Sequence, residues 1–185
     1  PVGTLFLLFT GLKVGALSDD VSLGEILDEF RFCWKASLAK KRSRHENKEL
    51  KSGGSSMMKP IRVAVVGLGL GAQRANGYLQ NDNALLCAVC DADLDRLKDF
   101  QSQWPGVRGY SNYQLMLETE ELDLVNVSTP DWMHFQHVKL ALQLDCHVLV
   151  EKPMVRNLDE AKMMIDMVET SGKTLMVGQN YRRLP

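Results

Sequence analysis

Residues 61–72 read IRVAVVGLGLGA, an apolar run rich in β-branched residues that is followed at once by a glycine-rich turn. The run predicts a buried strand, and a strand, glycine turn and helix in this order are typical of dinucleotide-binding sites. In that pattern Gly67 allows the tight turn and Gly69 lets the backbone approach a pyrophosphate. Ala72 is the small residue needed where the helix packs on the strand. We therefore predict a nucleotide-binding turn here.

From residue 61 onward, short β-branched runs alternate with amphipathic stretches, which is typical of parallel βαβ units. Right-handed crossovers then predict an α/β fold, a doubly wound Rossmann domain over residues 59–185 with strand order 3-2-1-4-5-6. Its ligand should lie at the carboxyl ends of the strands. The expected strands are Ile61–Val66, Ala84–Cys90, Val107–Tyr110, Leu122–Val127, His147–Glu151 and Thr174–Gly178.

The last helix carries the clearest signals for its two ends. Asn157 and Glu160 have capping-box spacing, and Gly172 stands where a C-terminal glycine cap belongs. Its apolar face is expected to comprise Leu158, Ala161, Ile165 and Val168.

Asp91 follows Gly71 by twenty positions and stands at the carboxyl end of the second expected strand. An acidic residue there accepts hydrogen bonds from the ribose hydroxyls of the adenosine and repels a 2′-phosphate. The pattern therefore favours NAD over NADP. An unliganded turn with a capping aspartate is the alternative, and it leaves the coincidence of strand, glycines and Asp91 unexplained.

Two further polar stretches follow the fourth and fifth expected strands, at 128–134 and 151–153. Lys152 is the cation expected beside a cofactor, where an ammonium group can hydrogen-bond a substrate hydroxyl or polarise a carbonyl. The alternative is a surface lysine paired with Glu151. His134 and His137 have helical spacing and could share a metal, but no third ligand presents itself, so we predict no metal site.

The four cysteines do not resemble a disulfide framework and are expected to be reduced thiols. Cys87 and Cys90 match the C-x-x-C spacing of redox and zinc sites. They lie, however, inside an expected strand, where residues three apart point to opposite faces. We therefore predict two core thiols.

A formal net charge of −1 over 185 residues gives no basic excess for binding nucleic acid or an anionic membrane surface. The apolar run at 5–9 is much shorter than the roughly 20 residues of a membrane span. We therefore expect a cytoplasmic protein that has neither nucleic acid nor a membrane as partner.

Residues 1–58 differ in composition from the remainder and are expected to be a flexible or appended leader. The stretch 18–39 has the spacing of an isolated amphipathic helix, and 40–44 is a basic cluster more typical of a solvated face than of a nuclear address. A linker composition at 51–56 precedes two methionines, one of which we expect to be the native start.

Taken together, these motifs resemble the N-terminal domain of the glucose-fructose oxidoreductase, inositol dehydrogenase and rhizopine-catabolism (Gfo/Idh/MocA) family. The resemblance runs from about Lys59 to the end, and the Glu-Lys-Pro element at 151–153 is its most specific part. It implies an NAD(P)-dependent oxidoreductase that acts on sugars, inositols or related polyols. It also implies a second α/β domain, which follows the Rossmann domain in this family.

The resemblance assigns roles to individual residues. Lys152 would be the catalytic lysine, in a Lys-Pro peptide that the family often holds cis. Asn180 and Arg182 would lie at the entrance to the second domain. The residues that would contact the cofactor are Gly67, Gly69, Leu70, Gly71, Ala72, Asp91, Thr129, Pro130, His134, Glu151 and Lys152.

The sequence stops at Pro185, where the family's substrate domain would begin. We therefore expect a fragment or incomplete product that binds a dinucleotide without efficient turnover, because the general base and most of the substrate pocket would come from the second domain. Homo-oligomers would need that domain as well. The alternative is a non-catalytic, dinucleotide-sensing regulatory protein, although such a protein has no need of Lys152.

Overall fold

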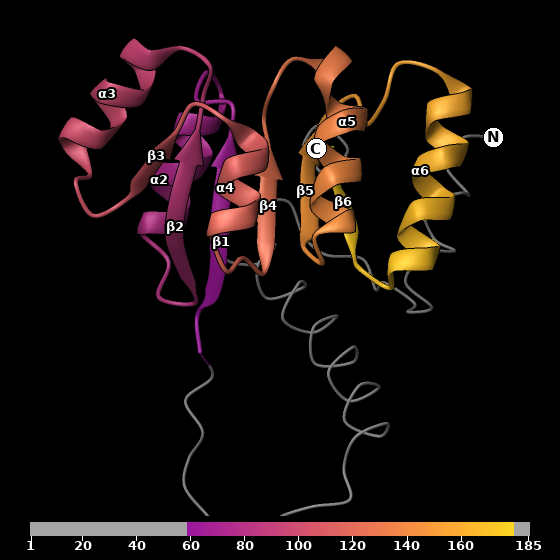
Figure 1. The fold of residues 1–185 in the computed structure, drawn as a ribbon, viewed down its shortest axis with the longest axis horizontal. Coiled ribbons are helices and arrows are strands. Elements are labelled where there is room, and N and C mark those ends of the chain that lie inside the picture. The colour runs from indigo at the N-terminus through magenta and orange to yellow at the C-terminus, as the bar shows by residue number, and fades with distance from the viewer. Residues whose placement is uncertain (1–58, 180–185) are drawn as a thin grey trace, which may run out of the picture. The chain divides into compact units, whose positions relative to one another are not determined.

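The chain is described by a computed structural model in which residues 59–179 are placed. They form one six-stranded parallel sheet of order β3-β2-β1-β4-β5-β6, so the predicted doubly wound topology is confirmed (Figure 1). The strands are β1 (Ile61–Val66), β2 (Ala84–Cys90), β3 (Arg108–Tyr110), β4 (Leu124–Val127), β5 (His147–Glu151) and β6 (Leu175–Gly178). The helices are α2 (Gly71–Leu79), α3 (Leu94–Gln103), α4 (Tyr113–Thr119), α5 (Asp131–Gln143) and α6 (Leu158–Ser171).

Three strands begin later than their apolar composition predicts, at Arg108, Leu124 and Leu175. At the start of β4 the reason is a side chain: the carboxylate of Asp123 accepts the backbone N–H of Arg62 at 2.8 Å. Before β3 the N–H of Val107 closes a turn onto the carbonyl of Trp104 at 3.0 Å. These two bonds, one within a turn and one between residues 61 positions apart, mark where β3 and β4 begin.

Helices cover both faces of the sheet. Helices α4, α5 and α6 lie on the face turned toward the viewer in Figure 1, and α2 packs on β1 and β2. The largest buried cluster joins the sheet to α4, α5 and α6 and includes Val127, Met116, Val138 and Met164. Burial of these apolar side chains is the main stabilising contribution to such a layered fold.

Helix α6 has the predicted ends but a different apolar face. The side chain of Asn157 accepts the N–H of Glu160, and Gly172 is left-handed with φ of 65°. The buried residues are, however, Met164 and Val168, whereas Leu158 is 78% exposed. The predicted face was wrong at Leu158 because this residue is the first of α6, in a stretch, 156–159, that is exposed throughout. Val168 is buried as predicted.

Strand β2 contains an irregularity at Cys87. Val63 pairs with Leu86 and Ala64 pairs with Ala88, so Cys87 has no partner on β1. The strict alternation that the sequence argument assumed therefore breaks at this residue. The conclusion about the thiols is confirmed, because Cys87 and Cys90 are free and buried and burial raises the pKa of each, that of Cys90 to about 12.

The expectations for residues 1–58 and for Asn180 and Arg182 lie outside the described residues. Within 59–179, no helix is both long enough and apolar enough to cross a membrane.

Candidate functional site

A cavity of about 1070 Å³ opens at the carboxyl ends of β1, β2 and β4. This is the edge at which a doubly wound sheet binds its ligand. The glycine turn after β1 forms one side of the cavity, and Asp91 of the β2–α3 loop with Arg96 of α3 forms the next. The start of α4 with Tyr113 and the first half of α5 with Met133 and His137 complete the lining.

The three glycines of the turn have different surroundings. Gly67 has φ of 89°, and a Cβ there would stand 2.6 Å from the carbonyl oxygen of Ser128, so only glycine fits. A Cβ at Gly71 would meet the side chains of Ser128 and Val65 at 3.0 Å. At Gly69 a Cβ would meet nothing within 4 Å. Gly67 and Gly71 therefore allow the turn to pack against Ser128 at the end of β4. Gly69 leaves the backbone open to the cavity.

Helix α2 begins without a cap. Its N-cap residue, Leu70, makes no side-chain hydrogen bond to the first turn, and that turn contains no acidic residue. In α3, by contrast, the carboxylate of Asp93 accepts two backbone N–H groups. The free N–H groups and the positive dipole end of α2 can therefore accept an anion such as a phosphate.

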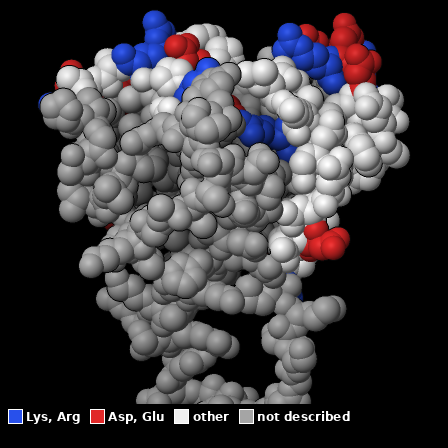
Figure 2. Space-filling view, turned by 180° about the vertical axis from the view of Figure 1, so that it is seen from behind, with Lys and Arg blue, Asp and Glu red and all other residues white. Residues whose placement is uncertain are grey.

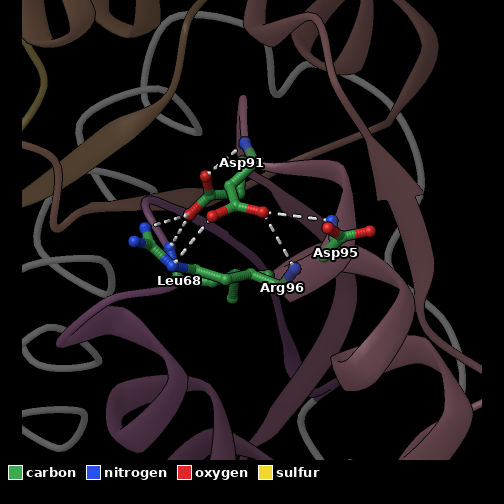
Figure 3. A network of polar contacts seen from close by, with 5 residues as sticks. Leu68, Asp91, Asp95 and Arg96 are labelled. Carbon is green, nitrogen blue, oxygen red and sulfur yellow. Dashed lines mark hydrogen bonds and ion pairs between the residues drawn. The ribbon is translucent and has the colours of Figure 1, made fainter.

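Asp91 is held in place by the backbone around it (Figure 3). Its carboxylate accepts the N–H of Leu68 at 2.6 Å through Oδ2 and the N–H of Asp93 at 2.8 Å through Oδ1. The residue is 9% exposed, and Nη1 of Arg96 lies 3.9 Å from Oδ2. Because each oxygen retains a lone pair, the fixed carboxylate can still accept hydroxyl groups of a ligand.

Thr129 and His137 form a second polar pair at the cavity. Oγ1 of Thr129 lies 3.0 Å from Nδ1 of His137, whose ring packs against that of Tyr113 with centroids 4.5 Å apart. Burial, and to a smaller extent the nearby ring of His134, lowers the pKa of His137 to about 4. The ring is therefore neutral at pH 7, and Nδ1 can accept the hydroxyl proton of Thr129.

His134 links two of the loops at the strand ends. Its Nε2 lies 2.8 Å from the carbonyl oxygen of Thr129, and its Nδ1 lies 2.8 Å from that of Pro153. The residue is 1% exposed and does not line the cavity. In this structure its contribution is to hold the β4–α5 loop against the loop that contains Lys152.

The Glu151–Lys152–Pro153 segment leaves the end of β5 with a cis Lys152–Pro153 peptide, as the resemblance implies. Glu151 does not pair with the lysine: its Oε1 accepts Nε of Arg74 at 2.9 Å and Nη2 at 2.5 Å. Lys152 is exposed, and within residues 59–179 its side chain makes no hydrogen bond or ion pair. The two neighbours of the lysine are therefore fixed while its ammonium group faces solvent.

A buried polar chain supports the turn from beneath. Nδ2 of Asn126 donates to the hydroxyl of Tyr78 at 3.0 Å, and Oγ of Ser128 donates to Oδ1 of Asn126 at 2.9 Å. Burial raises the pKa of Tyr78 to about 12, so its hydroxyl stays neutral. These two hydrogen bonds hold Ser128 in place, and Gly67 and Gly71 pack against this residue.

Charged side chains of both signs lie on the face of the molecule opposite to that of Figure 1. Figure 2 shows Lys and Arg beside Asp and Glu along the upper rim, seen from behind. Across residues 59–179, no group of three or more His, Cys, Asp or Glu side chains is placed so that it could hold a metal ion.

The cavity brings together part of the predicted set. Gly71, Ala72, His134, Glu151 and Lys152 lie outside its lining. Sequence reasoning missed Arg96, Tyr113 and Met133; the signal for Arg96 is its spacing from the helix cap Asp93, which puts it on the first turn of α3. The predicted residues that line the cavity are Gly67, Gly69, Leu70, Asp91, Thr129 and Pro130.

The sheet order, the uncapped helix start and the acidic residue after β2 define a nucleotide-binding Rossmann domain. Residues 61–179 match the family model described as oxidoreductase family, NAD-binding Rossmann fold (GFO_IDH_MocA). The chain belongs to the Gfo/Idh/MocA oxidoreductase family.

Individual relatives agree with this assignment. The chain is 31% identical to D-glucoside 3-dehydrogenase of Escherichia coli, over 66% of this chain and 36% of that protein. It is 28% identical to D-xylose 1-dehydrogenase (NADP(+)) 2 of Haloferax volcanii, over 63% of this chain and 36% of the relative.

Among solved structures, the chain is similar to an oxidoreductase of Agrobacterium radiobacter in complex with NAD+, L-tartaric acid and magnesium. The TM-score is 0.63 at 26% identity, over 67% of this chain and 36% of the other. The chain thus spans about a third of the length of the relatives it matches.

Proposed function

We propose that the cavity binds NAD in preference to NADP, and that the chain is the cofactor domain of a dehydrogenase acting on a sugar, an inositol or a related polyol. The observation that carries the proposal is the uncapped start of α2 beside the buried carboxylate of Asp91. The relatives' names, which include a D-glucoside and a D-xylose dehydrogenase, support the substrate class.

The residues present fit the two halves of a dinucleotide. The N–H groups from Gly69 to Ala72 would bind the pyrophosphate, since Gly69 leaves the backbone open. Asp91 would accept the hydroxyls of the adenosine ribose, because Leu68 and Asp93 hold its carboxylate in place. Thr129 and Pro130 would line the nicotinamide side, with His134 fixing their loop against Pro153.

When bound, NAD supplies the hydride acceptor. Lys152 would hold the substrate hydroxyl by a hydrogen bond from its ammonium group and so favour loss of the hydroxyl proton. Glu151 would position this lysine indirectly, since its carboxylate is already bound to Arg74. The general base and the substrate pocket would come from the second domain that the family resemblance implies.

Calorimetric titration of the 185-residue chain tests the cofactor assignment. We expect NAD to bind with one-to-one stoichiometry, and ADP to retain most of the affinity because the adenosine corner is built by this chain. Nicotinamide mononucleotide should bind far more weakly. Absence of heat with NAD at millimolar concentration would contradict the proposal.

The dehydrogenase assignment is tested on the full-length protein with a panel of hexoses, pentoses and inositols. We expect NAD-dependent oxidation of at least one of them, followed by absorbance at 340 nm. Binding of NAD without turnover of any polyol in the panel would favour the regulatory alternative.

A further inference from the structure

An ion pair connects helix α2 to the end of strand β5. Arg74, the fourth residue of α2, donates to Oε1 of Glu151 through Nε at 2.9 Å and through Nη2 at 2.5 Å. The two residues are 77 positions apart in the chain, and their side chains are 27% and 14% exposed. Because two donors of a planar guanidinium group meet one carboxylate, the pair fixes orientation as well as distance. The first turn of α2 is therefore held to the residue that precedes Lys152.

The carboxylate of Glu151 is also in contact with strand β6. A Cβ at Gly178 would stand 3.4 Å from Oε2 of Glu151, so this oxygen lies over the backbone of β6 while Oε1 accepts Arg74. The side chain of Glu151 is thus held between α2 and β6. It does not extend toward Lys152.

The ion pair lies beside the buried polar chain that supports the glycine turn. Burial raises the pKa of Tyr78 to about 12, and the charges of Arg74 and Glu151 act on the same hydroxyl in opposite directions. That hydroxyl accepts Nδ2 of Asn126, whose Oδ1 accepts the hydroxyl of Ser128. The glycine turn and the ion pair are therefore fixed by adjacent side chains.

Lys152 is flanked by two anchored residues that are held by different helices. On one side Glu151 is bound by Arg74 of α2, and on the other the carbonyl oxygen of Pro153 lies 2.8 Å from Nδ1 of His134 in α5. The α2 anchor differs from the other because the N–H groups of this helix are the proposed site of the pyrophosphate. The separation of a bound dinucleotide from the lysine backbone therefore depends on Arg74.

We infer that Arg74 is a positioning residue for the proposed reaction. It fixes the backbone of Lys152 relative to a dinucleotide bound at the start of α2, so that the ammonium group meets the substrate hydroxyl while the substrate carbon faces the nicotinamide. The inference rests on the proposed function. It requires Arg74 to affect turnover through Lys152 and to affect cofactor affinity little.

The test is a double-mutant cycle on kcat in the full-length protein, with the sugars and inositols of the panel described above. Arg74→Gln should lower kcat about ten- to a hundredfold, because a displacement of about 1 Å at a reacting group has an effect of this size. In the Lys152→Met background the same change should lower kcat less than about twofold, since the side chain that Arg74 positions is then absent. A purely structural role for Arg74 would lower kcat equally in both backgrounds.

Calorimetry on the 185-residue chain supplies the second measurement. Arg74→Gln should leave the dissociation constant of NAD within about threefold, because the glycine turn and Asp91 are held by other contacts. Arg74→Lys keeps a cation for Glu151 but loses the paired donors, so its kcat should fall only about two- to fivefold. If Arg74→Gln does not fold, the cycle is completed with Arg74→Lys.

Arg108→Gln is the matched control. Arg108 in β3 also donates through Nε and Nη2 to a glutamate, Glu120, whose side chain is 2% exposed, and neither residue lines the cavity. This substitution breaks an ion pair of the same kind far from Lys152 along the sheet order, and it should leave kcat within about twofold.

Three results would overturn the inference: an equal fall of kcat with and without Lys152, a fall no larger than that of Arg108→Gln, or a loss of NAD affinity as large as the loss of kcat. Each of them leaves the proposed function supported as long as NAD binds and Lys152→Met lowers turnover. If no member of the panel is oxidised, or if Lys152→Met does not lower kcat, the inference and the proposed role of the lysine both fail.

Discussion

The Asp91 corner and the Lys152 loop lie at the same edge of the sheet, yet the chain fixes them to different degrees. Asp91 is buried, and both of its carboxylate oxygens accept backbone N–H groups. In the Lys152 loop the flanking residues are fixed, Glu151 by Arg74 and Pro153 by His134, but the ammonium group is exposed. The Asp91 corner is therefore preorganised within this domain, whereas no hydrogen bond or ion pair within residues 59–179 fixes the ammonium group of Lys152.

The largest expected effect is at Gly67, where the turn meets the end of β4. Gly67→Ala should lower the free energy of unfolding by about 3 kcal/mol or more, because the new methyl group meets backbone atoms of Ser128 at φ of 89°. Equilibrium unfolding in urea measures the free energy of unfolding of this variant and of the unsubstituted chain.

Gly69→Ala is the matched control, since it adds the same methyl group in open space. It should change the free energy of unfolding by no more than about 0.5 kcal/mol and still weaken NAD binding. Equal losses of stability at the two glycines would show that the turn is not fixed as described.

His134→Ala should have the next largest effect, about 2 to 3 kcal/mol, because it removes a buried ring that lies 2.8 Å from the carbonyl oxygens of both Thr129 and Pro153 and donates to one of them. His134→Gln, which restores one donor, should lose less. If His134→Ala unfolds at the same urea concentration as the unsubstituted chain, the two loops are not held together by this ring.

The free energy of unfolding should depend on pH because His137 has a lower pKa in the folded chain than in the unfolded chain. Its pKa is about 4 in the folded chain and 6.5 in the unfolded reference, so the unfolded state binds more protons between these values. Stability should therefore be present above pH 6.5 and fall as the pH drops toward 4, by about 2 kcal/mol once the roughly 3 kcal/mol of the full shift is reduced for solvent screening of this partly exposed ring.

His137→Asn removes the titrating ring and retains an acceptor for Thr129. This variant should flatten the pH profile between 4 and 6.5. An unchanged profile would assign the loss of stability to other groups.

The smallest effect on stability is expected at Lys152, which is exposed and whose side chain makes no hydrogen bond or ion pair within the described part of the chain. Lys152→Met should leave the free energy of unfolding within about 0.5 kcal/mol. In the full-length protein the same change should lower kcat about a hundred- to ten-thousandfold, the range of general acid–base catalysis. A large loss of stability would mean that the lysine is structural.

The strand order and the glycine turn could be predicted from the sequence because both depend on local periodicity and on the handedness of crossovers. The same reasoning failed at Leu158, since the helical spacing of apolar residues does not show which turn of the helix is exposed. Met164 was missed as a core residue although it is fully buried.

The site could be predicted only as a set of residue types at strand ends. The contact between Leu68 and Asp91 joins residues 23 positions apart, and the link from His134 to Pro153 joins helix α5 to the loop after β5. These contacts depend on the placement of strands side by side, which spacing alone does not contain. To predict from the sequence that Arg96 lines the cavity, the first residue of α3 and its cap at Asp93 would have to be located to within one residue.

The unpaired Cys87 in β2 determines the position of Asp91 relative to the end of β1. Beyond Cys87 the pairing runs from Ala64 with Ala88 to Val66 with Cys90, and the N–H of Gly67 donates to the carbonyl of Cys90 at 2.8 Å. A chain lacking this one residue would displace Asp91 by about 3.3 Å along the strand and turn it to the other face of the sheet. The one extra residue of β2 therefore brings the carboxylate of Asp91 to the backbone N–H of Leu68, 2.6 Å away.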